Sequence, residues 1–154
     1  MISKLEKVRV FTETIFHGSF GNGHGEYYIV LECIDAKGVP RTKEKYAQYQ
    51  NKKKNEVELM ALIEILKSFN RKCEIELHMQ KGFVSETLKA ERIKKWQQEN
   101  WKNKKGEDIK NSALWKEYLE LSKGHEIRIV AEKETEYSRA MRLQLQTWIK
   151  LQGR

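Results

Sequence analysis

A carboxylate inside a strongly apolar stretch is the first feature of this chain that could do chemistry. Glu58 lies in the segment 54–67, where apolar residues recur at spacings of three and four. That pattern predicts a helix capped by Asn55 and wide enough in its apolar surface to pack against a sheet. A carboxylate on its buried side needs a cation or metal ion to offset its desolvation. The alternative is that Glu58 lies on the exposed edge.

Basic side chains form two groups along the chain. The 30 Lys and Arg residues exceed the 22 Asp and Glu residues and give a net charge of +8. Clustered cations bind polyanions such as nucleic-acid phosphates, although a solvated lysine surface would look the same in sequence. The groups are Arg41, Lys43, Lys45, Lys52, Lys53 and Lys54, and Lys94, Lys95, Lys102, Lys104, Lys105 and Lys110.

The remaining bulk features are those expected of one cytoplasmic domain spanning residues 1–154. No apolar run reaches the roughly 18 residues of a membrane span, and the first residues do not open a secretory signal. Cys33 and Cys73 lie in strand-like segments without the spacing of a zinc site. We therefore expect buried, reduced thiols.

These candidate residues must be positioned by strands in the first half of the chain. Alternating apolar and polar residues predict strands over 7–16, 26–35 and 39–49, which form an antiparallel meander. After the helix, segment 74–79 is a fourth strand. A strand-helix-strand crossover makes it parallel to the first strand, so the predicted sheet is mixed.

The second half is mainly helical and ends in one more strand and helix. The predicted segments are a helix over 83–93, an aperiodic segment over 96–110, a helix over 112–121 capped by Ser112, a strand over 126–130 and a helix over 135–151.

This order of elements, together with several motifs, resembles type 1 ribonuclease H. The segment Asn55-Glu56-Val57-Glu58-Leu59-Met60-Ala61 is similar to the family's Asn-Arg-Met-Glu-Leu-Met-Ala, and Phe11-Thr12-Glu13 is similar to its Tyr-Thr-Asp. Trp101-Lys102 and the run from Lys110 to Trp115 are similar to the two ends of its basic protrusion. The resemblance implies an α/β, ribonuclease H-like fold with three antiparallel strands, then two parallel ones, flanked by helices.

The resemblance also implies a catalytic centre, which is incomplete here. The family uses four carboxylates to hold two magnesium ions roughly 4 Å apart. Glu13 and Glu58 match the first two positions, whereas Gln80 and Arg139 replace the last two. We expect no metal cofactor. An active enzyme would need Mg²⁺ or Mn²⁺ on Glu13, Glu58 and, in a shifted register, Glu136.

Arg139 suggests a specific replacement for the metal. In the register used here it projects from the last helix toward Glu13 and Glu58, so its guanidinium would neutralise the two acids. His78 is interpreted as a core or hydrogen-bonded histidine and not as a substitute ligand.

Positions that face nucleic acid in the family are better retained than the catalytic ones. Asn22 and Asn55 match asparagines that contact the hybrid, and Lys53 falls where the family binds a DNA-strand phosphate. Trp96, Trp101 and Trp115 could pack the protrusion or stack on bases, and we favour packing. The lysines expected to bind nucleic acid beside Lys53 are Lys94, Lys95, Lys102, Lys104 and Lys105.

The function that follows is binding of an RNA/DNA hybrid or another duplex without cleavage. One alternative is an active, metal-dependent ribonuclease H with a rearranged metal site. The other is a protein-interaction scaffold of a mobile element, since a fold alone does not define a function.

Overall fold

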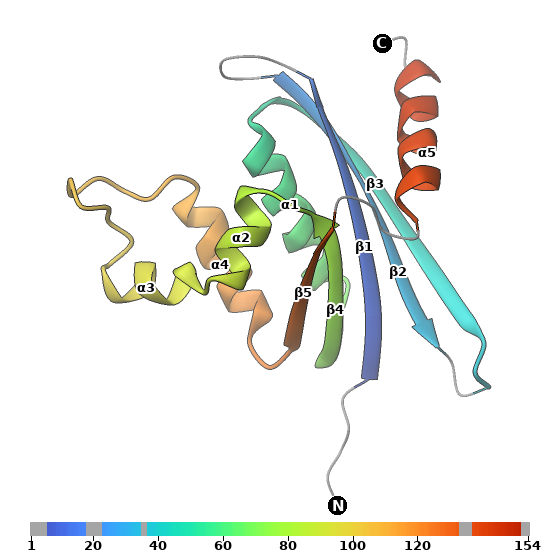
Figure 1. Ribbon diagram of the computed structural model, residues 1–154, viewed down its shortest axis with the longest axis horizontal. Helices are drawn as coiled ribbons and strands as arrows, with labels where there is room; N and C mark the ends of the chain where they lie inside the picture. Colours follow the sequence, from blue (N-terminus) through green and yellow to red (C-terminus); the bar gives the residue numbers. More distant parts are fainter. Residues whose placement is uncertain (1–5, 18–22, 35–36, 133–136, 152–154) are drawn as a thin grey trace, which may run out of the picture.

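A five-stranded mixed sheet forms the centre of the protein (Figure 1). The computed structural model describes residues 6–17, 23–34, 37–132 and 137–151. Across the sheet the strand order is β3-β2-β1-β4-β5. The strands are β1 (Glu6–His17), β2 (Gly23–Ile34), β3 (Pro40–Lys52), β4 (Cys73–Gln80) and β5 (Glu126–Glu132).

The strand directions follow from the connections between strands. β1, β2 and β3 are consecutive antiparallel neighbours. β4 follows α1 (Lys54–Lys67) and lies parallel to β1, and β5 lies parallel to β4. A helical crossover returns the chain to the same end of the sheet, which makes such pairs parallel. The predicted fold class is confirmed.

Helices cover both faces of the sheet. α1 and α4 pack together on one face, and α5 lies on the other (Figure 1). No helix in the described ranges is long and apolar enough to cross a bilayer. The helices after α1 are α2 (Phe83–Lys89), α3 (Arg92–Gln98), α4 (Ser112–Ser122) and α5 (Ser138–Leu151).

Alternate residues of β1 serve two separate apolar clusters. Val8 and Val10 belong to the main core with α1, whereas Phe11 packs with Met141 and Leu145 of α5. Successive side chains of a strand point to opposite faces, so a single strand contributes to both layers. The same alternation places Glu13 on the α5 side.

α1 has the bounds that its apolar pattern predicts, but its cap differs. Seven of its side chains are buried, as expected for a helix lying against a sheet. Lys53, not Asn55, is the N-cap residue. The Lys53 backbone N–H donates to Glu56 Oε1 at 3.1 Å. The helix therefore begins at Lys54, and Asn55 lies within its first turn.

The segment between β4 and α4 departs from the predicted pattern. The expected helix over 83–93 divides at Glu91, whose φ of 53° is left-handed, and α3 then continues to Gln98. α4 is capped by Asn111 with φ 60°, and not by Ser112, which is its first helical residue. Asparagine tolerates this left-handed conformation better than most residues.

The tryptophans of this segment pack on one another. The Trp96 ring lies with its centroid 5.6 Å from that of Trp115 and 6.4 Å from that of Trp101. Trp115 is 1% exposed. Trp96 and Trp101 pack against the main apolar core, to which Trp115 belongs, so the predicted packing of these three side chains is confirmed.

Both cysteines are free thiols, as predicted. Cys33 lies opposite Val8 and Cys73 opposite Glu6, so β1 runs between the two cysteines. Cys73 is buried and Cys33 is half-buried. Burial raises the pKa of both thiols, which makes them poor nucleophiles.

Candidate nucleic-acid site

β1 and β4 bring Glu13 and Gln80 together. Phe11 lies opposite His78 in this parallel pair, so the residues two positions further along also lie side by side. Gln80 donates from Nε2 to Glu13 Oε1 over 2.9 Å. The Glu13 side chain is only 1% exposed. A neutral amide thus binds a buried carboxylate where the family resemblance implies two metal-binding acids.

α5 places a cation beside the same carboxylate. Arg142 Nη1 lies 3.8 Å from Glu13 Oε1, and the Arg142 side chain is 33% exposed. Ser138, Met141 and Leu145 form the buried side of the helix. Arg142 lies at the edge of that side, within reach of the sheet.

The prediction that Arg139 fills this position is wrong. Arg139 is exposed. Because each helical residue turns about 100°, a helix buried at 138, 141 and 145 points residue 139 away from the sheet. The cation near Glu13 comes from one turn later in the sequence, and Arg142 takes the place proposed for Arg139.

Glu58 is half-buried near the start of α1. Burial raises the pKa of its carboxyl, while Lys54, one turn earlier, acts in the opposite direction. Within the described ranges, no group of three His, Cys, Asp or Glu side chains could hold a metal ion. Glu136, the alternative ligand, lies outside the described residues.

His78 is a buried, hydrogen-bonded histidine, as interpreted from the sequence. Its ring stacks on Phe11 with centroids 4.6 Å apart. Nε2 lies 2.6 Å from Glu76 Oε1, and Nδ1 lies 3.5 Å from Glu132 Oε1. The second separation is long for a hydrogen bond but close enough for an electrostatic contact. Carboxylates on both sides thus orient the imidazole.

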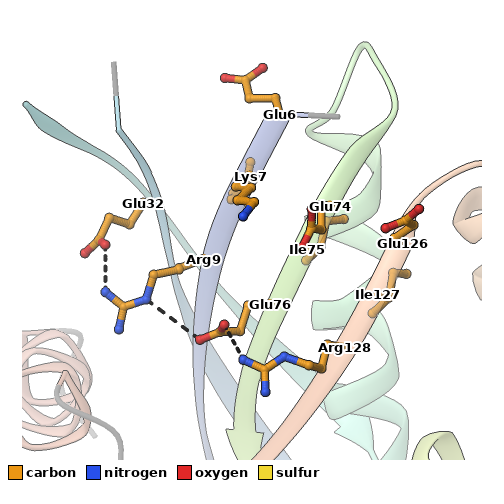
Figure 2. Close-up of a pocket in the computed structure, with 11 residues that line it drawn as sticks. Glu6, Lys7, Arg9, Glu32, Glu74, Ile75, Glu76, Glu126, Ile127 and Arg128 are labelled. Atoms are coloured by element: carbon orange, nitrogen blue, oxygen red, sulfur yellow. Dashed lines mark hydrogen bonds and ion pairs between the residues drawn. The ribbon is translucent and has the colours of Figure 1, made fainter. Parts of the chain in front are cut away.

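A row of alternating charges crosses the sheet beside this histidine (Figure 2). Arg9 faces Glu32 on β2 and Glu76 on β4, and Glu76 faces Arg128 on β5. Arg9 Nη1 lies 2.8 Å from Glu32 Oε1, and Arg9 Nε lies 3.9 Å from Glu76 Oε1. Arg128 also pairs with Glu76. We call these four side chains the charge ladder.

The charge ladder lines a groove of about 670 Å³. Its member Glu32 also contacts the residue that precedes α5. Tyr137, the residue before α5, donates to Glu32. The Tyr137 ring also contacts Phe11 edge-on, with centroids 4.6 Å apart. The ladder therefore helps to fix where α5 begins, and so where Arg142 can reach.

The lysines predicted to bind nucleic acid are on the surface. Two of them have acidic partners, because Lys102 pairs with Asp108 and Lys94 lies 3.4 Å from Glu91. Asn55 is half-buried in the first turn of α1, and Asn22 lies outside the described residues. All six of these predicted lysines are exposed: Lys53, Lys94, Lys95, Lys102, Lys104 and Lys105.

The mixed sheet, the helices on its two faces and the acid at the centre of β1 define the ribonuclease H-like class. A family model described as RNase H matches residues 6–131. A ribonuclease H from Thermoanaerobacter sp. (strain X514) is 31% identical over 142 residues, covering 90% of this chain and 86% of the relative. The chain belongs to the type 1 ribonuclease H family.

Solved structures agree on the fold. LC9-RNase H1, a type 1 RNase H with the type 2 active-site motif, superposes with a TM-score of 0.80 at 16% identity. That match covers 94% of this chain and 72% of the other. LC11-RNase H1, solved in complex with an RNA/DNA hybrid, gives a TM-score of 0.54 at 13% identity and covers 87% and 92% of the two chains.

The residues present do not fit the pair of divalent metal ions that the family implies. Such ions require several anionic oxygens around one centre. Gln80 directs an N–H donor, not an oxygen, at Glu13, and Arg142 adds a positive charge. The Glu13 carboxylate is instead approached by two nitrogen groups, the amide of Gln80 and the guanidinium of Arg142.

Sequence reasoning missed Arg142 and the charge ladder. The signal for Arg142 was the apolar spacing of Met141, Leu145 and Trp148, which sets the buried side of α5. The sequence indicates the charge ladder less clearly. Arg9, Glu76 and Arg128 are charged residues that each lie between apolar residues of a predicted strand. Only the strand register shows that opposite charges meet.

Proposed function

We propose that this protein binds an RNA/DNA hybrid or another nucleic-acid duplex and does not cleave it. Family membership supports the nucleic-acid part of the proposal. The exposed lysines supply cations suited to backbone phosphates, which provide most of the affinity in such complexes. The hybrid is the first ligand to test, because LC11-RNase H1 was solved with one.

The hydrogen bond from Gln80 to Glu13 carries the non-catalytic part of the proposal. Metal-assisted cleavage of a phosphodiester needs ions that activate water and stabilise the leaving oxygen. The Gln80 amide donates a hydrogen bond to the Glu13 carboxylate, and Arg142 supplies a positive charge beside it. Neither residue can serve as an anionic metal ligand.

A fluorescence-anisotropy panel would test the proposal with labelled hybrid, double-stranded RNA and double-stranded DNA of equal length. The same samples, incubated with Mg²⁺ or Mn²⁺, serve as the cleavage assay. We expect binding of at least one duplex with intact strands. Metal-dependent cleavage of the RNA strand would support an active enzyme instead, and no binding to any duplex would support the protein-interaction scaffold.

Three lysines of the protrusion offer a matched comparison. Changing Lys102, Lys104 and Lys105 to Ala should weaken binding, because all three are exposed on that segment. Lys7 in β1, Lys37 before β3 and Lys123 after α4 are also exposed but lie outside that segment. Their replacement removes the same charge and should have a much smaller effect.

A further inference from the structure

Glu13 is an ionisable group that folding removes almost entirely from water. Its side chain is 1% exposed in the middle of β1, next to the apolar cluster under α5. Burying a charged carboxylate is costly unless charge and hydrogen bonds compensate for the lost water. An ionised Glu13 therefore needs a cation close to its carboxylate.

The structure supplies a cation of its own, held in place by the fold. Arg142 Nη1 approaches Glu13 Oε1 to 3.8 Å. Ser138, Met141 and Leu145 anchor the same helix to the sheet, which places the Arg142 side chain beside Glu13. A guanidinium stays protonated at all ordinary pH values, which makes its charge permanent.

The same carboxylate oxygen is also engaged by Gln80. The Gln80 amide lies 2.9 Å from Oε1, the atom that Arg142 approaches. To bind at Glu13, a divalent ion would have to displace the Arg142 guanidinium. The Gln80 amide would also have to rotate so that its oxygen, and not its nitrogen, faces the ion. Among the residues that the structure describes, the ion would still find no group of three side chains able to hold it.

We propose that Arg142 is the resident cation of this centre and replaces divalent metal there. The fold then needs no Mg²⁺ for stability. This inference rests on the proposed function in one respect: duplex binding should not require Mg²⁺. The metal response of the protein alone does not depend on any nucleic acid.

Thermal unfolding in EDTA, in about 10 mM MgCl₂ and in MnCl₂, all at matched ionic strength, tests the first part. We expect the wild-type midpoint to change by less than about 1 °C, because a ligand stabilises only the state that it binds. A rise of several degrees in either metal would overturn the proposal.

Arg142→Gln tests whether the charge matters, and Arg139→Gln is the matched control on the exposed side of α5. We expect Arg142→Gln to lower the midpoint by about 5 °C or more and Arg139→Gln to leave it unchanged. Arg142→Lys, which keeps the charge, should recover part of the loss. Equal midpoints for the two glutamine variants would overturn the proposal.

A double variant keeps the test decisive if Arg142→Gln fails to fold. Glu13→Gln/Arg142→Gln removes both charges, so it should be more stable than Arg142→Gln alone. Instability equal to that of the single variant would indicate that Arg142 acts only through packing and would overturn its role as a cation.

Anisotropy with the hybrid, in EDTA and in MgCl₂, separates the two proposals. Affinity in MgCl₂ that is equal to or weaker than that in EDTA supports both of them, because Mg²⁺ competes with the lysines for phosphates. Binding that requires Mg²⁺ contradicts the resident cation while leaving nucleic-acid binding intact. If no duplex binds, the proposed function fails, but the unfolding experiments still decide the role of Arg142.

Discussion

His78 stacks on Phe11 with ring centroids 4.6 Å apart and planes inclined by 18°. The contact joins the apolar cluster under α5 to the polar part of the same sheet face. Through Glu76 the histidine meets the charge ladder, and Glu132 lies on its other side. Gln80 follows two residues later on β4, so this stack supports the strand that positions the amide at Glu13.

The charge ladder should make the protein sensitive to acid. In the folded state the pKa of Glu32 is lowered, chiefly because Tyr137 donates to it, and that of Glu76 is lowered chiefly by Arg128. A lowered folded pKa gives stability above the unfolded value, which is lost as pH falls through the folded value. The free energy of unfolding should therefore decrease below about pH 5.

Urea unfolding at a series of pH values from about 7 to 3 would measure this loss. Glu76→Gln should flatten the profile, because the variant cannot lose that proton-linked contribution. Glu126→Gln removes an exposed glutamate from the same face and is the control. Profiles that coincide for wild type and Glu76→Gln would show that the ladder does not govern acid stability.

Purified protein should not cleave a labelled hybrid in Mg²⁺ or Mn²⁺. If Gln80 and Arg139 replace two of the four family acids, as the sequence resemblance implies, the barrier to phosphoryl transfer is left without its metal stabilisation. Denaturing gels over a long incubation provide the measurement. Robust cleavage that disappears in Glu58→Gln would contradict the expectation, whereas trace cleavage that survives that substitution indicates a contaminating nuclease.

Duplex affinity should fall linearly with salt on logarithmic axes. The expected slope is about −0.9 for each phosphate neutralised on a B-form duplex. Replacing Lys102, Lys104 and Lys105 by Ala should make the slope shallower by up to about three units, and by less if Asp108 already neutralises Lys102. An unchanged slope would assign this segment to folding or to a protein partner.

Trp115 should contribute to stability and not to base stacking. The side chain is 1% exposed, between Trp96 and Tyr118. Trp115→Ala should lower the free energy of unfolding by about 3–5 kcal/mol, measured by urea titration. Weakened hybrid binding without any loss of stability would favour the stacking alternative.

The fold and the first acid of the site could be predicted from the sequence for identifiable reasons. α1 can be predicted because the spacing of its apolar residues is a local property of one helix. Its predicted bounds match the structure. Glu13 and Gln80 lie together because β1 and β4 pair in parallel with Phe11 opposite His78, two residues before each of them.

The cation at Glu13 was decided only by the tertiary structure. Sequence similarity at the last helix allowed a register that put Arg139 there, whereas the rotation of α5 depends on which side chains fill the space over β1 and β2. The charge ladder has the same origin, since its four members come from four strands and meet only through register. Local pattern determines which elements form, but packing between elements determines which charges meet.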